Sequence, residues 1–470
     1  MRKALSKLLF FIVLANILFA CNEVETINSD PEISLDLVAT PEVVSVNTPS
    51  FSQNPNVVIN QNGDTIVVWY EYAGTADSTS TVFINTNTNL TGWDVPTILE
   101  PTIEANTSGP PNIAMNDNGD AFVGWGMKTT LTSIGEMWVK RYTLANGWEP
   151  AMQVNLNSNP NTNSVFRQSD IAIDEFGNAV AVWTYGKVDG STQDIWTSVY
   201  TLDQGWGSTQ YLGTTGYYSG SPQVAMRGGN AIAVWNNSTA ITAYTYQAGV
   251  GWNTGDNFSI SDGDSQNPQV AMSTDGSGIV VWEQEEYAGP SIPGSPTDIY
   301  ATHFNGTIWS ESVKINPVKD LEYSTDPKIA MDANGNAIAA WINTSYGIEK
   351  YISASYYNKS LLQWGVTERI SPIGGHSADV AMNSSGSAVV SWVRLLYTRN
   401  GYITDVNATR FSNYTGWGPS GRISNTISGS DIDFVETAIN NQGNFVTVWE
   451  KINKSSNDRN TFDIWASQVE

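Results

Sequence analysis

The chain has 470 residues, of which 22 are basic and 46 acidic, so its formal net charge is −24. Nucleic-acid backbones repel a chain this acidic, and the absence of any basic stripe argues further against a nucleic-acid partner. The chain has only two histidines, which excludes a histidine-rich metal site and leaves a Ser-His-Asp arrangement few candidates.

The N-terminal segment 1–20 has the layout of a secretory signal. Three basic residues within the first seven positions precede an apolar run, 8–20, that is too short to span a membrane. The only cysteine, Cys21, follows directly, and the sequence LFAC at 18–21 resembles the lipobox of bacterial lipoproteins. The resemblance implies that the Cys21 thiol is acylated, as with palmitate. The alternative is an ordinary signal peptide that happens to carry a cysteine.

The lipobox resemblance also implies a cellular location. A lipidated Cys21 would tie the protein to a membrane of the bacterial cell envelope, with the outer membrane favoured and the periplasmic or external side left open. Residues 21–32 are then a short tether, and 33–470 form a single domain. Segment 33–46 precedes the first repeat and has the character of a fourth strand without a hairpin of its own.

Eight repeats begin near residues 55, 111, 169, 222, 268, 327, 377 and 434. Each contains a phrase such as SDIAIDEFGNAVAVW at 169–183, in which two apolar runs flank a polar turn with glycine. This pattern predicts an antiparallel hairpin with the glycine at positive φ. A third run begins like Asp194-Ile195-Trp196, and a Gly-Trp pair opens a fourth.

Four strands in each of eight repeats predict an all-β fold, an eight-bladed β-propeller of four-stranded antiparallel blades. The last repeat ends after its third strand, at the end of the sequence. We therefore expect the N-terminal strand 33–46 to pair with the last blade and close the ring, which would remove exposed sheet edges.

The tryptophan that ends the phrase recurs in every repeat, whereas a ligand-stacking residue would be expected in one or a few. This recurrence predicts a structural residue that packs between blades. The eight residues are Trp69, Trp125, Trp183, Trp235, Trp282, Trp341, Trp392 and Trp449.

Connections between strands two and three vary most in length, and in a propeller they share one face with the links between blades. Variable loops on a rigid scaffold commonly carry binding. The candidate residues of this face combine phenols, carboxylates and a guanidinium, which suit a sugar or a peptide. They are Tyr70, Tyr72, Tyr185, Glu283, Glu285, Tyr287, Arg394 and Tyr397. The alternative for each is a solvated loop residue without a partner.

No catalytic residue and no metal ligand can be assigned from the sequence, and no cofactor is expected. Calcium is weakly suggested by the recurrent acid of the hairpin turn, such as Asp174 and Asp332. That turn lacks the alternating ligands of a calcium loop, and an Asp there caps its own turn.

The phrase ending in Gly-Asn-Ala-x-Ala-Val-Trp resembles repeats of uncharacterised bacterial β-propeller lipoproteins. This resemblance implies a β-propeller fold and a location at the cell envelope. The favoured hypothesis is a non-catalytic, lipid-anchored module that binds a glycan or an envelope protein. One alternative is a carbohydrate-active enzyme, a hydrolase or lyase, that uses carboxylates of the variable face. A lesser alternative is an outer-membrane assembly factor, suggested by similarity to eight-bladed quinoprotein-like propellers.

Overall fold

The computed structural model describes most of the chain from residue 41 onward. The described residues are 41–45, 51–72, 80–88, 92–99, 105–107, 109–129, 135–154, 164–187, 193–215, 220–237, 239–259, 263–285, 296–316, 322–345, 349–399, 401–425, 427–428, 431–453 and 461–470. Their regular elements are all β-strands, and no helix among them is long and apolar enough to cross a membrane.

Each repeat contributes three long strands in chain order. The first strands are β2 (Phe51–Ile59), β7 (Asn112–Met115), β12 (Ser164–Ile173), β17 (Gln223–Arg227), β22 (Ser265–Met272), β26 (Glu322–Met331), β31 (Gly375–Met382) and β37 (Asp431–Ile439). The second strands are β3 (Thr65–Tyr72), β8 (Ala121–Thr129), β13 (Ala179–Lys187), β18 (Asn230–Asn237), β23 (Gly278–Glu285), β27 (Ala337–Ser345), β32 (Ala388–Thr398) and β38 (Phe445–Asn453). The third strands are β4 (Ser80–Asn87), β9 (Gly135–Thr143), β14 (Gln193–Thr201), β19 (Ala240–Gln247), β24 (Thr297–Phe304), β28 (Glu349–Asn358), β33 (Gly401–Ser412) and β39 (Thr461–Val469).

Short pieces complete the sheets. On the outer side they are β1 (Glu42–Val43), β5 (Thr97–Ile98), β10 (Gly147–Trp148), β11 (Met152–Gln153), β15 (Gly205–Trp206), β16 (Gln210–Thr215), β20 (Gly251–Trp252), β21 (Asp256–Phe258), β25 (Val313–Lys314), β29 (Gln363–Trp364), β30 (Glu368–Arg369), β34 (Gly416–Trp417), β35 (Gly421–Arg422) and β36 (Ile427–Ser428). In repeat two, β6 (Ala105–Thr107) precedes β7 and pairs with β8.

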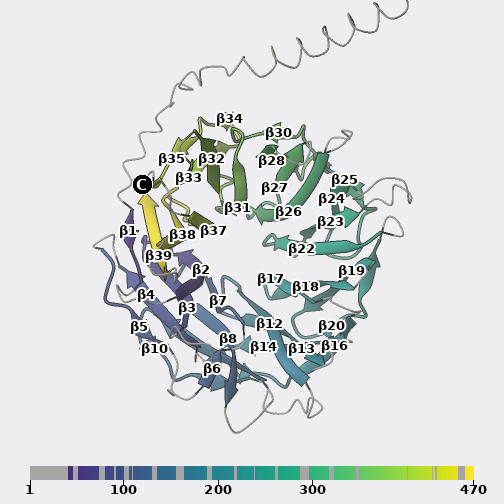
Figure 1. The fold of residues 1–470 in the computed structure, drawn as a ribbon. Helices are drawn as coiled ribbons and strands as arrows, with labels where there is room; N and C mark the ends of the chain where they lie inside the picture. The colour runs from purple at the N-terminus through teal and green to yellow at the C-terminus, as the bar shows by residue number, and fades with distance from the viewer. Residues whose placement is uncertain are drawn as a thin grey trace, which may run out of the picture.

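The sheets are arranged around a common axis with the first strand of each repeat innermost (Figure 1). These inner strands lie against one another in chain order, and β37 also lies against β2. Within each repeat the strands pair antiparallel from the inside outward. Antiparallel sheets radiating in this way from one axis are the β-propeller architecture.

The first and last repeats share one sheet, ordered β37-β38-β39-β2-β3-β4-β5. They meet where Phe51 of β2 pairs in parallel with Phe462 of β39. On the outer side, β1 pairs antiparallel with β39, with Glu42 opposite Ala466. This two-residue strand is the described part of the predicted strand 33–46, since residues 33–40 and 46 lie outside the described ranges.

The turn between the first and second strands has the predicted conformation. The seven turn glycines have φ between 80° and 89°, a region that side chains with a Cβ rarely enter. They are Gly63, Gly119, Gly177, Gly276, Gly335, Gly386 and Gly443. In repeat three, Asp174 Oδ1 accepts hydrogen bonds from the backbone N–H groups of Phe176 and Asn178, at 3.0 and 2.8 Å. The acid therefore caps its own turn, as the sequence analysis expected.

Replacing Asp174 with Ala should lower the free energy of unfolding by about 2 kcal/mol, because a buried acceptor of several hydrogen bonds is lost. Its Oδ2 also accepts from the backbone N–H of Gly229 in the next repeat, at 3.0 Å. Chemical denaturation measures the loss, and Asp174→Asn, which keeps one oxygen acceptor, should cost less. Calcium should leave the wild-type denaturation midpoint unchanged; a calcium-dependent rise would make this turn a cation site instead.

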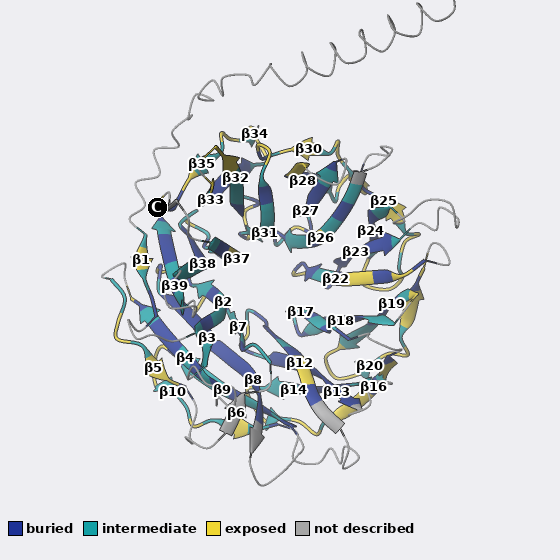
Figure 2. Ribbon diagram, in the orientation of Figure 1, coloured by how far each residue is buried: buried dark blue, intermediate teal, exposed yellow. Residues whose placement is uncertain are grey.

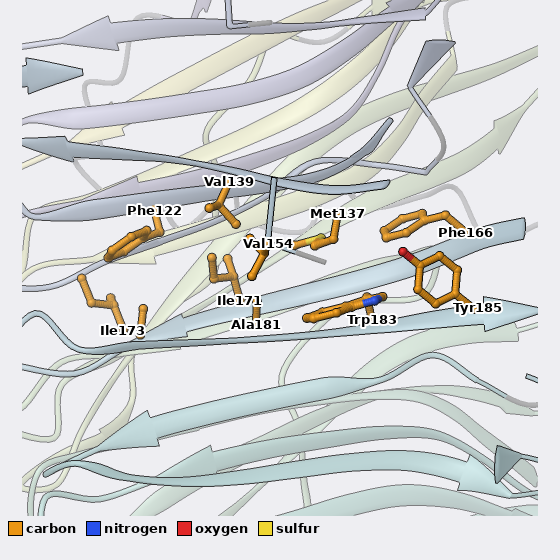
Figure 3. Packing of buried hydrophobic residues seen from close by; sticks show 11 residues of the cluster. Phe122, Met137, Val139, Val154, Phe166, Ile171, Ile173, Ala181, Trp183 and Tyr185 are labelled. Atoms are coloured by element: carbon orange, nitrogen blue, oxygen red, sulfur yellow. The ribbon is translucent and has the colours of Figure 1, made fainter. Parts of the chain in front are cut away.

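The eight repeat tryptophans are all buried, with at most 2% of their surface exposed. Each belongs to a different apolar cluster that fills the space between two neighbouring sheets. Figure 3 shows one cluster, in which Trp183 and Ile171 of repeat three face Phe122 and Val139 of repeat two. Exposed residues gather instead on the outer strands and connections (Figure 2).

The Gly-Trp pair opens the fourth strand as predicted, but that strand is not continuous. Trp206 pairs with Tyr200 of β14, and Gln210 pairs with Thr197. The outer segment therefore uses four steps where β14 uses three. The extra residue is a β-bulge, which separates β15 from β16. The outer edge of each sheet is therefore built from short pieces.

Candidate functional site

The two ends of the propeller axis differ. The turns between strands one and two and between strands three and four form one face, which we call the hairpin face. The connections between strands two and three and the links between repeats form the other, the loop face. The candidate site lies where the inner strands begin, at the loop face.

At this end the inner strands are strained. Six non-glycine residues have φ between 44° and 53°, a conformation that costs about 1–3 kcal/mol each and persists only where neighbours hold it. They are Asn54, Ser221, Asn267, Asp326, Ser377 and Phe434. Five of the six, all but Ser221, coincide with a register shift between the inner strand and its neighbour.

Carboxylates that follow the repeat tryptophan hold two of these strained residues. Glu450 Oε1 accepts a hydrogen bond from the backbone N–H of Asn54 at 2.5 Å, which links repeats eight and one. Glu283 Oε1 accepts from the backbone N–H of Asp326 at 2.5 Å and from Asn267 Nδ2 at 2.7 Å. Both glutamates are 6% exposed, so their carboxyl groups support the backbone rather than point freely into water.

A mixed aromatic and polar group surrounds the first of these links. We name the five residues Gln53, Asn54, Tyr70, Tyr72 and Glu450 the seam cluster. The rings of Tyr70 and Tyr72 meet edge to face, with centroids 5.0 Å apart. Asn54 Nδ2 donates to the Tyr70 hydroxyl at 3.0 Å, and that hydroxyl donates to Gln53 Oε1 at 3.3 Å. Four of the five side chains are only half-buried, so this polar and aromatic surface remains accessible.

Burial shapes the acid–base properties of the seam cluster. It raises the pKa of the Glu450 carboxyl to about 7, although the Asn54 hydrogen bond opposes the shift. It also raises the pKa of the Tyr70 phenol above its ordinary value. The cluster therefore presents two phenol hydroxyls and two amides, beside a buried carboxyl whose pKa is about 7.

A ring of polar residues lies on the inner strands, and six of its eight members are two positions beyond a strained residue. It contains Asn56, Asn112, Asp170, Gln223, Gln269, Lys328, Asp379 and Glu436. Several members bind the backbone of the next repeat: Asp170 Oδ2 accepts from Val224 N–H and Asp379 Oδ2 from Thr437 N–H, both at 2.8 Å. Burial raises the pKa of the Asp170 carboxyl to about 6.

Three charged members of this ring come together and form what we call the axial triad. Lys328 Nζ lies 3.7 Å from Glu436 Oε1, and the Glu436 carboxyl is hydrogen-bonded to that of Asp379. Burial raises the pKa of Asp379, and it raises that of Glu436 to about 8, so Glu436 keeps its proton at neutral pH. The Lys328 side chain is 30% exposed, so water still reaches the triad.

The structure separates the residues that the sequence analysis grouped. Among the candidates that the structure describes, Tyr70 and Tyr72 are in ring contact with each other. Tyr185 is 2% exposed and packs on Phe166 in the core between repeats two and three, so it is not a surface residue (Figure 3).

The other candidates lie apart from the seam cluster. Arg394 forms a two-pronged ion pair with Asp405 on the adjacent strand, at 2.9 and 2.6 Å. Tyr397 is 80% exposed at the end of β32, and Glu285 ends β23 half-buried. Tyr287 lies outside the described residues, as does Cys21.

Sequence reasoning missed Gln53, Asn54 and Glu450, and it missed the axial triad. A signal for the ring was present, because in seven of the eight repeats one polar residue precedes the apolar pair of the inner strand, as Lys328 precedes Ile329-Ala330. In the described part of the chain, no group of three or more His, Cys, Asp or Glu side chains is placed to hold a metal ion.

No protein-family model and no curated protein matches this chain. Similar solved structures include a protein of unknown function from Dyadobacter fermentans, with a TM-score of 0.44 and 10% identity over 92% of this chain and 98% of that one. The β-propeller domain of the trilobed protease from Pyrococcus furiosus has a TM-score of 0.43 and 9% identity, covering 81% and 97%.

An α-L-arabinofuranosidase from Fusarium graminearum has a TM-score of 0.41 and 12% identity, over 77% of this chain and 92% of that chain. Because all three TM-scores are below 0.5, these similarities carry no argument about the activity of this protein.

Proposed function

We propose that this chain is a lipid-anchored, eight-bladed β-propeller of the bacterial cell envelope. It binds a glycan at its loop face and does not catalyse a reaction of that glycan. Contacts between successive inner strands, including β37 with β2, support eight blades in a closed ring. The pairing of β1 with β39 supports closure by the N-terminal strand. The signal-like segment 1–20 and Cys21 support a lipid anchor, with the outer membrane as the favoured site.

The observation that carries the glycan proposal is the seam cluster. Sugars present C–H faces that pack on aromatic rings and hydroxyl groups that need donors and acceptors. Tyr70 and Tyr72 supply rings, and Gln53 and Asn54 supply amide groups beside them. The buried Glu450 carboxyl holds the Asn54 backbone in place. An apolar surface with a few convergent polar groups is typical of small-ligand sites.

The state of the carboxyl groups favours binding over hydrolysis. Glycosidases hold two carboxyl groups roughly 5–10 Å apart so that the sugar fits between them. Asp379 and Glu436 are hydrogen-bonded directly to each other, which leaves no room for a substrate between them. Glu283 and Glu450 are occupied by strained backbone N–H groups.

Replacing Tyr72 with Ala should weaken glycan binding by about tenfold or more, because one aromatic contact of roughly 1–2 kcal/mol is lost. The measurement is binding of the wild type and the variant to a glycan and polysaccharide array, followed by titration of the strongest ligand. Tyr414→Ala is the matched control, since Tyr414 is 97% exposed on the hairpin face. Equal losses in both variants, or no specific glycan at all, would contradict the proposal.

One observation favours an enzyme as the second candidate. Glu436 keeps its proton at neutral pH, as a general acid must. Incubating each bound polysaccharide with the protein separates the two functions. Products that disappear with Glu436→Gln while binding persists would establish the enzyme, and unchanged polysaccharide supports the binding module.

A further inference from the structure

The hairpin face carries a regular set of exposed apolar residues. In repeats two to seven, the turn between strands three and four presents at least one large apolar side chain, 49% to 97% exposed. We name this set the crown; its members are Leu144, Leu202, Val250, Ile308, Leu361, Leu362 and Tyr414. Their recurrence at one structural position distinguishes them from apolar residues scattered singly over a surface.

The crown lies at the same end of the molecule as the turns between strands one and two. Strand pairing is antiparallel throughout each repeat, so these two turns must emerge together. Contacts agree with this geometry: a methyl group added to Gly119 would lie 3.1 Å from Leu144. Lys359, beside Leu361, likewise forms an ion pair with Asp275 in the hairpin turn of repeat five.

The direction of β1 places the N-terminal side of the chain at this same face. Val43 pairs with Trp465 and Glu42 with Ala466, so β1 starts toward the end of β39. That end lies beside the start of β38, because Val469 pairs with Phe445, just after the hairpin turn that contains Gly443. The chain therefore enters the fold from the hairpin face, 20 positions after Cys21 at Pro41.

We propose that the crown rests on the lipid bilayer and orients the propeller, with the hairpin face on the membrane and the loop face turned away. This inference rests on the lipid anchor of the proposed function. The lipid would tie only Cys21 to the bilayer, so contacts made by the folded domain decide which of its faces meets the membrane. Once the lipid is inserted, several weak contacts at one face act together at high effective concentration.

The negative charges of the hairpin face favour a zwitterionic bilayer over an anionic one. Exposed Asp117 and Asp203 lie on the turns of the hairpin face, and the whole chain carries a formal net charge of −24. Anionic headgroups would repel these acids, so the crown should contact a zwitterionic surface. The acids also argue against an anionic protein as the partner of this face.

The experiment uses the full-length, membrane-extracted protein in phosphatidylcholine vesicles, with an environment-sensitive fluorophore on a single introduced cysteine. Val250→Cys and Ile308→Cys test the crown, and Tyr397→Cys is the loop-face control. We expect blue-shifted emission and severalfold weaker iodide quenching at both crown positions and not at the control. In vesicles rich in phosphatidylglycerol the shielding should decrease.

Equal iodide quenching of crown and control labels in vesicle-bound protein would overturn the crown proposal and leave the anchor intact. A separate measurement, labelling of the wild-type chain with a thiol reagent, tests whether Cys21 is acylated. The wild-type chain has Cys21 as its only cysteine, so an acylated chain should take up no label and a free thiol should react. A Cys21→Ser chain that cosediments with vesicles as completely as the wild type would likewise reject the anchor. All labelled positions are exposed, so substitution there leaves the core unchanged.

Discussion

Replacing Trp341 with Ala should lower the free energy of unfolding by about 3–5 kcal/mol, the cost of removing a large aromatic side chain from a packed core. Trp341 is fully buried in the cluster that joins the sheets of repeats five and six. Its ring lies with Ile279 and Val281 of the neighbouring sheet, so the cavity would weaken an interface between repeats as well as one sheet.

Trp364 is the matched control for this substitution. It belongs to the same repeat and packs on the edge of the same cluster, but it is only partly buried. Trp364→Ala should therefore cost only about 1–2 kcal/mol, in proportion to the smaller apolar area it removes from water. Urea denaturation followed by circular dichroism gives both values. A cost for Trp341 no larger than that for Trp364 would show that the repeat tryptophans are not the main packing residues.

The second large effect is expected at the axial triad. Replacing Lys328 with Met removes the cation beside Asp379 and Glu436 and leaves two carboxyl groups facing each other. Breaking a fully buried ion pair costs about 3–5 kcal/mol, and water access at this site reduces the expected loss to about 2–3 kcal/mol at about pH 9. At about pH 7, where Glu436 holds its proton, the loss should be about 1 kcal/mol.

The sign of the pH dependence follows from the raised pKa values. Glu436 titrates at about 8 in the folded protein and near 4.5 when unfolded, so between these values only the folded state holds the proton. Stability is therefore highest at the acid end of this window and falls as the pH rises through 8. Glu450, with a folded pKa of about 7, acts in the same direction between 4.5 and 7.

Thermal unfolding at about pH 7 and about pH 9 tests these expectations. The wild type should melt at a lower temperature at the higher pH, and Lys328→Met should steepen this fall. Lys328→Arg, which keeps the charge, should stay close to the wild type. Adding Glu436→Gln to Lys328→Met should restore most of the lost stability at pH 9. A penalty for Lys328→Met that does not change with pH would mean that the triad is not coupled by a shared proton.

The relative positions of Tyr70, Tyr72 and Tyr185 could have been predicted from the sequence. Side chains alternate between the two faces of a strand. The residue two positions after the repeat tryptophan therefore shares the face of the tryptophan, and the residues one and three positions after it share the opposite face. Tyr70 and Tyr72 are one and three positions after Trp69 and lie together, whereas Tyr185 is two positions after Trp183 and is buried with it. This alternation would have removed Tyr185 from the predicted binding face.

Other contacts of the site could not be inferred in this way. Glu450 and Asn54 are 396 positions apart in the sequence and meet only because the last repeat lies beside the first. Lys328 and Glu436 come from repeats six and eight and meet beside Asp379 of repeat seven. Register shifts of the inner strands lie beside these contacts, at Thr325/Lys328 and Asp433/Val435, and no residue type marks such shifts reliably.

Local sequence signals were sufficient to predict the repeat, the strands and the turns of this protein. Their signals are local: apolar alternation sets the strands, and glycines such as Gly335 supply the positive φ that a tight turn requires. The arrangement of the sheets was needed to show which polar residues meet at the axis, which face carries the crown, and where the N-terminal strand enters the fold. These features depend on how distant sheets are placed around one axis, and the free energy of that placement comes from contacts between repeats rather than within them.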